Sequence, residues 1–178
     1  MNNFHVITGG PGSGKTSLIN ELNNNGFLTV PEEGRRIIKE QIEFSGEGLP
    51  WKNKAAFATL MLDASLESYH KMIQEAAGSL VFFDRGIPDT IGYMELENIP
   101  VFPETEQIIL ANPYHTNVFL LPPWKSIYET DNERKQSWQE AVNTYEIMRD
   151  IYSRYGYNII NVPFDTIINR KDFILNNL

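Results

Sequence analysis

Cysteine is absent from the 178-residue chain, which excludes disulfide bonds, thiolate catalysis and cysteine-based metal sites. Histidine is scarce, and His5, His70 and His115 do not have the spacing of metal ligands. His5 lies in an apolar segment, so we expect it to be structural. No hydrophobic run is long enough to span a membrane, and the N-terminus lacks the charged and then apolar pattern of a leader. These absences predict a cytoplasmic protein that does not bind membranes.

Basic residues are outnumbered, with 15 Lys and Arg against 23 Asp and Glu and a net charge of −8. This balance argues against broad binding to nucleic acid, although it is compatible with a local basic groove. The length and a hydrophobic content of 42% predict one domain, residues 1–178, with a buried core. We find no internal repeat or linker, and the composition leaves homo-oligomerisation open.

Short apolar runs alternate with helical patterns along the chain. The runs are apolar on both faces, as strands buried in a parallel sheet should be. They are Phe4–Ile7, Phe27–Val30, Leu80–Phe83, Val118–Leu121 and Ile159–Val162, and the helical patterns are Lys15–Asn24, Gly34–Phe44, Ala55–Ala77, Ser137–Tyr155 and Asp165–Leu178. This alternation predicts a three-layer α/β/α fold with a five-stranded parallel sheet, which binds ligands at the carboxyl ends of its strands.

The segment Gly9–Thr16 fits G-x-x-x-x-G-K-[ST], the P-loop that wraps the phosphates of a nucleoside triphosphate. An apolar strand precedes it and a helical pattern follows it, as the motif requires. Its glycines let backbone amides point inward as an anion cradle, which the helix dipole strengthens. We assign ATP binding to Gly10, Pro11, Gly12, Ser13, Gly14, Lys15, Thr16 and Ser17. Lys15 is expected to reach the β- and γ-phosphates, and the Thr16 hydroxyl to bind Mg²⁺.

Two alternatives for this segment fit its residues less well. A glycine-rich turn without a ligand explains neither Lys15 nor the flanking pattern. The dinucleotide fingerprint G-x-G-x-x-G fails, because its third glycine position, counted from Gly10 and Gly12, holds Lys15.

The third apolar run ends in Asp84, which Arg85 follows. A strand-end aspartate in such folds lies near Mg²⁺, directly or through water. The pattern alone is weak, because such an aspartate also caps turns, but the upstream P-loop favours the metal role. Arg85 is poorly suited to activating water and well suited to holding an anion or substrate near the reacting phosphoryl group. A surface salt bridge is the alternative for Arg85.

Two carboxylates, Glu32 and Glu33, follow the second apolar run. One of them could act as general base on an acceptor hydroxyl, or bind that hydroxyl by a hydrogen bond. Acidic residues at a helix start also favour the helix dipole, which accounts for the pair equally well. We favour Glu32 as the catalytic residue because it lies closer to the strand end.

The segment from Pro123 to Gln136 contains Lys125, Arg134 and Lys135. In kinases of this architecture such a segment is a lid that brings arginine to the developing charge. We therefore predict a lid at about residues 123–136 with Arg134 as its catalytic residue. A solvated, charged helix start is the alternative, because it would have the same sequence pattern. The acceptor region is expected at about residues 86–115.

These residues together resemble the nucleoside- and nucleotide-kinase branch of P-loop proteins. More narrowly, the chain is similar to small bacterial ATPases with an AAA-like domain, which resemble ribosylnicotinamide kinases. The resemblance rests on Gly9–Thr16, Pro31–Arg36, Asp84–Gly86 and the segment 133–136. It implies that Glu32 is the catalytic base, that Asp84 and Arg85 form the acidic-arginine pair after the third strand, and that Arg134 is a lid arginine. The second carboxylate, Glu33, and the single lid arginine depart from the family pattern.

Three functions remain compatible with the sequence. The first is a kinase that transfers the γ-phosphoryl group of ATP to a small-molecule hydroxyl or phosphate acceptor. The second is an ATPase or nucleotide-dependent switch that acts on a protein partner. The third, an enzyme that processes nucleic acid, is disfavoured by the acidic composition. A GTPase is disfavoured because Asn-Lys-x-Asp is absent: the segment that begins at Asn53 ends in Ala56.

Overall fold

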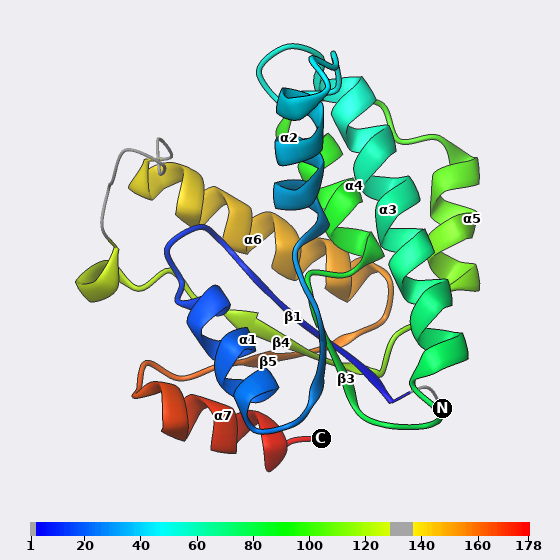
Figure 1. Cartoon of the computed structure of the whole chain (residues 1–178). Coiled ribbons are helices and arrows are strands. Elements are labelled where there is room, and N and C mark those ends of the chain that lie inside the picture. Colours follow the sequence, from blue (N-terminus) through cyan, green and yellow to red (C-terminus); the bar gives the residue numbers. More distant parts are fainter. Residues whose placement is uncertain (1–2, 129–136) are drawn as a thin grey trace.

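The structure is a computed structural model that describes residues 3–128 and 137–178. Five parallel strands in these residues form one sheet, in the order β2-β3-β1-β4-β5 (Figure 1). The strands are β1 (Phe4–Gly9), β2 (Leu28–Val30), β3 (Val81–Asp84), β4 (Asn117–Leu121) and β5 (Asn158–Asn161). The predicted α/β fold with a five-stranded parallel sheet is confirmed. In the register of the sheet, Ile7 of β1 lies beside Asp84 of β3, so the P-loop and Asp84 leave the sheet at the same edge.

Helices cover both faces of the sheet, so the fold has three layers (Figure 1). Helices α1 (Lys15–Asn24) and α7 (Ile167–Leu175) lie on one face, and α3 (Lys54–Glu75), α4 (Ile87–Leu96) and α6 (Trp138–Arg154) on the other. The remaining elements are α2 (Glu33–Glu43), α5 (Pro103–Ala111) and the short 3₁₀ helix η1 (Lys125–Ile127). None of the described helices combines the length and apolar character that a membrane crossing requires.

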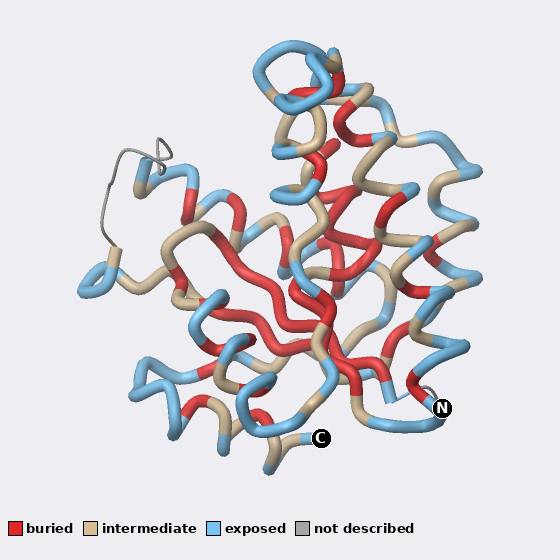
Figure 2. Tube along the Cα trace, viewed as in Figure 1, coloured by how far each residue is buried: buried red, intermediate tan, exposed pale blue. Residues whose placement is uncertain are grey.

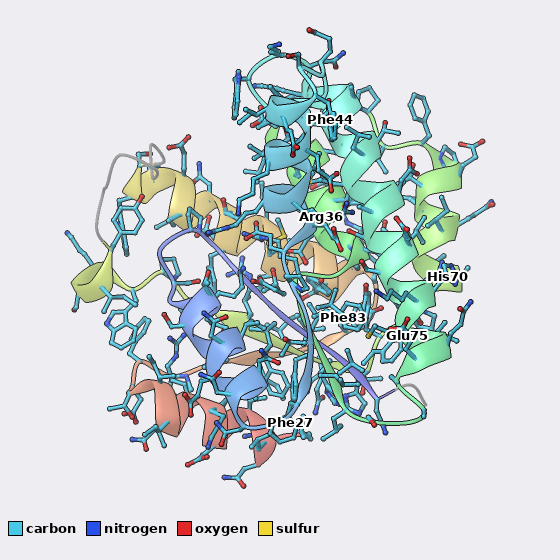
Figure 3. The ribbon with its side chains drawn as sticks, viewed as in Figure 1. Phe27, Arg36, Phe44, His70, Glu75 and Phe83 are labelled. Carbon is cyan, nitrogen blue, oxygen red and sulfur yellow. The ribbon has the colours of Figure 1, made fainter. Side chains whose placement is uncertain are left out.

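The alternation of side chains along the central strands builds two cores. Phe4 and Val6 of β1 pack toward α3, α4 and α6, whereas Ile7 packs toward α1 and α7. Figure 2 shows the central strands as the most buried part of the chain. Figure 3 places Phe83 inside the molecule, whereas Phe44 at the end of α2 is exposed.

Two features of the fold differ from the sequence prediction. The strands β2 and β5 lie at the two edges of the sheet and are not buried on both faces as we expected, and Leu28 is 42% exposed. Helices α4 and α5 occupy the segment 86–115 that we assigned only as an acceptor region. Both helices are short and contain proline in the first turn, at Pro88 and Pro103, where the missing N–H has no cost. Proline is also typical of loops, so the prolines alone do not distinguish these two helices from loops in the sequence.

Candidate active site at the carboxyl ends of the strands

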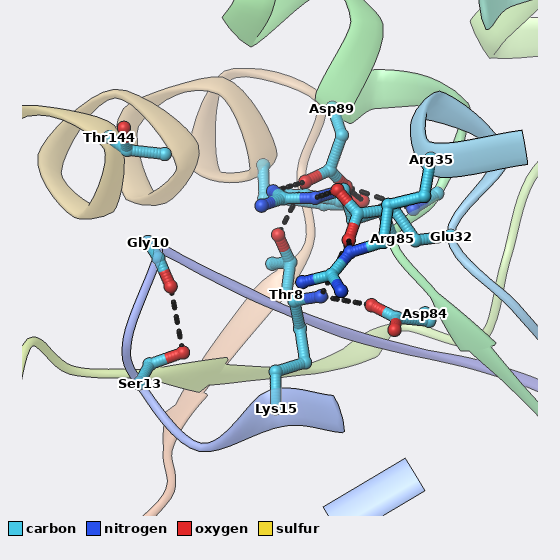
Figure 4. A network of polar contacts seen from close by, with 12 residues as sticks. Thr8, Gly10, Ser13, Lys15, Glu32, Arg35, Asp84, Arg85, Asp89 and Thr144 are labelled. Atoms are coloured by element: carbon cyan, nitrogen blue, oxygen red, sulfur yellow. Dashed lines mark hydrogen bonds and ion pairs between the residues drawn. The ribbon is translucent and has the colours of Figure 1, made fainter. Parts of the chain in front are cut away.

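The P-loop leads directly from β1 into α1. The Ser13 hydroxyl donates a hydrogen bond of 2.8 Å to the Gly10 carbonyl, which closes the turn (Figure 4). Gly14 precedes the helix with a φ of 80°, a left-handed conformation that favours glycine. Lys15 is buried in the first turn, while Thr16 and Ser17 are exposed there. The positive end of the α1 dipole and the loop amides thus lie at one place, as anion binding requires.

Lys15 lies between two carboxylates that follow different strands. Its ammonium group donates a hydrogen bond to Asp84, at the end of β3 (Figure 4). Its Nζ is also 3.7 Å from Oε2 of Glu32, which follows β2. The side chains of Lys15 and Asp84 are only 6% and 7% exposed, so their charges interact with little screening by solvent. The structure therefore brings together three residues that the sequence separates.

Glu32 is also held by Arg85, the residue after Asp84. Arg85 Nε donates a hydrogen bond of 3.0 Å to Oε1 of Glu32. Burial raises the pKa of Glu32, but the charges of Arg85, Lys15 and Arg35 and the hydrogen bond from Arg85 outweigh it and lower the pKa to about 2. Glu32 is therefore ionised at neutral pH. Among the described residues it makes no side-chain hydrogen bond to cap α2, although it stands at the N-cap position.

The side chain of Glu33 contacts α3 and its own helix, α2. Its carboxylate accepts hydrogen bonds from Ser68 of α3 and, at 2.6 Å, from Nε of Arg36. Arg36 in turn donates to Glu40 at 2.7 Å. Glu33 thus joins α2 to α3, whereas Glu32 faces the P-loop lysine.

Asp89 is a residue at this site that the sequence analysis did not assign to it. This carboxylate, in the first turn of α4, accepts hydrogen bonds from Thr8 and, at 3.0 Å, from Arg85 (Figure 4). The Tyr152 hydroxyl of α6 donates a third, of 2.6 Å. The carboxylate also accepts one of 2.9 Å from the Gly86 amide. A carboxylate three residues after a glycine that precedes a Pro-containing helix start is a capping signal, and that signal would have located α4.

Arg85 combines an unusual backbone conformation with a partly buried charge. Its φ of 74° lies in the left-handed region, which costs a non-glycine residue about 1–2 kcal/mol. The Arg85 amide donates to the Ile7 carbonyl at 3.0 Å, which fixes the turn against β1. Burial lowers the pKa of Arg85, but Glu32, Asp89 and Asp84 outweigh it and raise that pKa above its ordinary value. The turn therefore aims a permanent cation at the edge where the P-loop lies.

A family model described as "AAA domain" matches residues 4–170. The chain belongs to this AAA domain family. No curated protein matches the chain in sequence. The matched range includes the P-loop, Asp84 and the five strands.

Solved structures with low sequence identity share the fold of this AAA domain. Thymidylate kinase from Ehrlichia chaffeensis has a TM-score of 0.65 at 17% identity, with 98% of this chain and 97% of that chain covered. A NadR protein in complex with NR has a TM-score of 0.73 at 16% identity, and deoxyadenosine kinase from M. mycoides with bound dATP has 0.54 at 16%. Both alignments cover 98% of this chain, with 49% of NadR and 97% of the deoxyadenosine kinase. The chain therefore has the P-loop kinase fold and spans about half the length of NadR.

Most of the predicted lid, residues 129–136 of 123–136, lies outside the described residues. Arg134 and Lys135 fall outside the described residues, whereas Lys125 lies in η1. Before η1, the ring of Trp124 lies 5.3 Å from the ring of Phe164, which follows β5. The loops after β4 and β5 therefore meet beside the P-loop edge of the sheet.

The described residues offer few protein ligands for a metal ion. They contain no group of three or more His, Asp or Glu side chains that could hold one. Thr16, the exposed last residue of the P-loop, and Asp84 are the oxygen donors that the sequence analysis assigned to Mg²⁺, and Asp84 contacts Lys15 in this structure. A metal at this edge would therefore take its other ligands from phosphate oxygens and water, as Mg²⁺ usually does.

Proposed function

We propose that the protein is a kinase that transfers the γ-phosphoryl group of ATP to a nucleoside-like or other small-molecule hydroxyl or phosphate acceptor. The observation that carries the proposal is the convergence of Lys15, Glu32 and Arg85 beside the P-loop. Two cations and one carboxylate that faces them provide a phosphate-binding side and an acceptor-binding side in one place. Phosphoryl transfer depends mainly on such positioning and charge.

The residues fit Mg²⁺ and ATP. The P-loop amides and Lys15 would hold the phosphates, and Thr16 and Asp84 would hold Mg²⁺. When bound, Mg²⁺ neutralises charge that develops on the transferred group. Arg85 stands where a water-activating carboxylate would follow Asp84 in a hydrolytic P-loop protein, which supports transfer to an acceptor over hydrolysis.

Glu32 is suited to hold the acceptor. With a pKa of about 2 it is a weak base, so it would accept a hydrogen bond from an acceptor hydroxyl more readily than a full proton. A loose transition state for phosphoryl transfer requires little proton removal before the bond to phosphorus forms. Glu32 would therefore orient the hydroxyl, and a partial proton transfer to it would follow late.

ATP turnover with a panel of acceptors tests the proposal. The similar structures of thymidylate kinase, deoxyadenosine kinase and NadR with NR guide the panel, which contains nucleosides, nucleotides and ribosylated pyridines. We expect one class to stimulate ADP formation and to gain a phosphate by mass spectrometry. Lys15→Ala should abolish this turnover, while Lys39→Ala, an exposed lysine on α2, should not.

The outcomes separate the proposed kinase from its alternative. ATP binding with slow hydrolysis that no panel member stimulates would contradict a kinase for these acceptors. It would favour a nucleotide-dependent ATPase or switch that acts on a protein partner. Unchanged turnover in Lys15→Ala would contradict the role of the P-loop itself.

A further inference from the structure

Arg170 of α7 is a buried cation in contact with the P-loop. Its side chain is only 2% exposed, and Nη2 donates a hydrogen bond of 3.1 Å to the Ser13 carbonyl. A Cβ at Gly14 would lie 2.7 Å from Nη1 of Arg170. Glycine at position 14 therefore serves two needs: its positive φ and the close approach of this guanidinium.

Arg170 has no acidic partner within residues 3–128 and 137–178. No carboxylate in these two ranges interacts with its charge, and its buried Nε has no hydrogen-bond partner among the described residues. The centre of the Trp124 ring lies 5.5 Å from the guanidinium carbon of Arg170, which is close enough for a cation–π interaction. Burial lowers the pKa of Arg170, yet an arginine in a protein keeps its proton at neutral pH. Among residues 3–128 and 137–178, the charge is thus buried without a carboxylate that balances it.

A comparison with Arg85 shows how unusual this is. Arg85 is more accessible, with a side chain that is 23% exposed, and yet it pairs with both Glu32 and Asp89. A buried cation normally needs such partners, because burial of an unpaired charge is costly. The cost at Arg170 therefore calls for an anion that the described protein residues do not supply.

The peptide that Arg170 contacts belongs to the anion cradle. The Ser13 carbonyl and the Gly14 amide are the two ends of one peptide group. A cation bound to the carbonyl polarises that group and makes its N–H a stronger donor. We propose that Arg170 is a positioning residue for the triphosphate: it fixes and polarises the Ser13–Gly14 peptide, and its charge is balanced by the phosphates. This inference rests on the proposed function, because it takes the P-loop as a triphosphate site.

The inference makes opposite predictions for stability and for binding. Arg170→Gln keeps a donor for the Ser13 carbonyl but removes the charge, and Arg170→Lys keeps the charge. We expect the urea midpoint of the ligand-free Arg170→Gln protein to be equal to or higher than that of the native protein. Its affinity for tripolyphosphate, measured by calorimetry, should fall at least about tenfold, as for loss of a charge-assisted interaction. Arg170→Lys should remain within about threefold of the native protein. Lys171→Gln, which removes the next charge on α7, should bind tripolyphosphate like the native protein.

Each other outcome overturns the inference. A destabilised or unfolded Arg170→Gln protein would make Arg170 a structural residue. Equal losses in Arg170→Gln and Arg170→Lys would show that the charge is not what matters. A loss of adenosine affinity with native tripolyphosphate affinity would place Arg170 at the nucleobase. If the native protein binds neither ATP nor tripolyphosphate, the proposed function fails as well; if it binds both and Arg170→Gln binds them equally, only this inference fails.

Discussion

Arg85 Nε donates a 3.0 Å hydrogen bond to Oε1 of Glu32, so the turns that follow β3 and β2 are joined directly. The pair combines a cation that cannot lose its proton with a carboxylate whose pKa is lowered to about 2. Both charges persist at every pH at which the protein would work. The ion pair between Arg85 and Glu32 therefore stays intact near neutral pH, because neither side chain changes its charge there.

Glu32→Gln should lower phosphoryl transfer about 10²-fold or more, the lower end of the effect of a positioned acid or base. The amide keeps the shape but loses the charge that orients the acceptor hydroxyl. ATP affinity should change much less, because Glu32 faces Lys15 across 3.7 Å and is not part of the P-loop. Rates under saturating ATP, together with nucleotide binding by calorimetry, check this.

Glu33→Gln is the matched control, since Glu33 joins α2 to α3 through Ser68 and Arg36. It should lower stability slightly and leave the rate of transfer nearly unchanged. A larger loss of rate in Glu33→Gln than in Glu32→Gln would show that the base assignment is wrong.

The sequence predicts the fold well because the central strands are buried on both faces. The runs Phe4–Ile7 and Val118–Leu121 lie within β1 and β4, where burial and periodicity agree. The P-loop is equally predictable, because its chemistry depends on neighbouring residues in the chain. Asp89 and Arg170 were missed for the opposite reason: Asp89 meets Thr8 across 81 residues, and Arg170 meets Ser13 across 157. Neither contact leaves a local pattern.

Asp89→Asn should lower the free energy of unfolding by about 3 kcal/mol, as expected when one partner of a buried ion pair is removed. Thr8, Arg85 and Tyr152 all donate to this carboxylate, and an amide turns one of its two acceptors into a donor. Urea unfolding measures the change. Asp63→Asn, at an exposed position of α3, is the control and should be nearly neutral. A loss below about 1 kcal/mol for Asp89→Asn would mean that the network reorganises around the amide.

Gly86→Ala should be destabilising by about 1–3 kcal/mol, the range for overpacking a core. A Cβ at this position would lie 2.7 Å from the Tyr152 hydroxyl and 2.9 Å from a methyl group of Val6. Gly34→Ala provides the contrast, because a Cβ there would make ordinary contacts of 3.5 and 3.6 Å within a helix. Thermal and urea unfolding should show Gly34→Ala neutral or stabilised by up to about 1 kcal/mol. If Gly86→Ala unfolds like the native protein, the turn after Arg85 is less tightly packed than this structure shows.

His5 should make the protein less stable as the pH falls from about 6.5 to about 4. The residue is 2% exposed, and its ring centroid lies 4.3 Å from that of His115, with the ring planes tilted by 36°. Burial and the charge of His115 lower the pKa of His5 from 6.5 to about 4. Between about pH 6.5 and pH 4, His5 therefore binds a proton in the unfolded chain but stays neutral in the folded protein. The contribution of His5 to stability is present in full above pH 6.5 and is lost as the pH falls through this range.

The expected loss between pH 7.5 and pH 5.0 is about 2 kcal/mol from His5 alone. The window separates His5 from Glu32, whose lowered pKa makes it contribute only below its ordinary value of 4.5. His5→Gln should therefore flatten the pH dependence of urea unfolding between pH 7.5 and 5.0, whatever its effect on stability at pH 7.5. His70→Gln, at an exposed position of α3, should keep the native slope. The same slope in His5→Gln and the native protein would show that His5 gains a proton in the folded state as readily as in the unfolded chain, and that its burial does not control its charge.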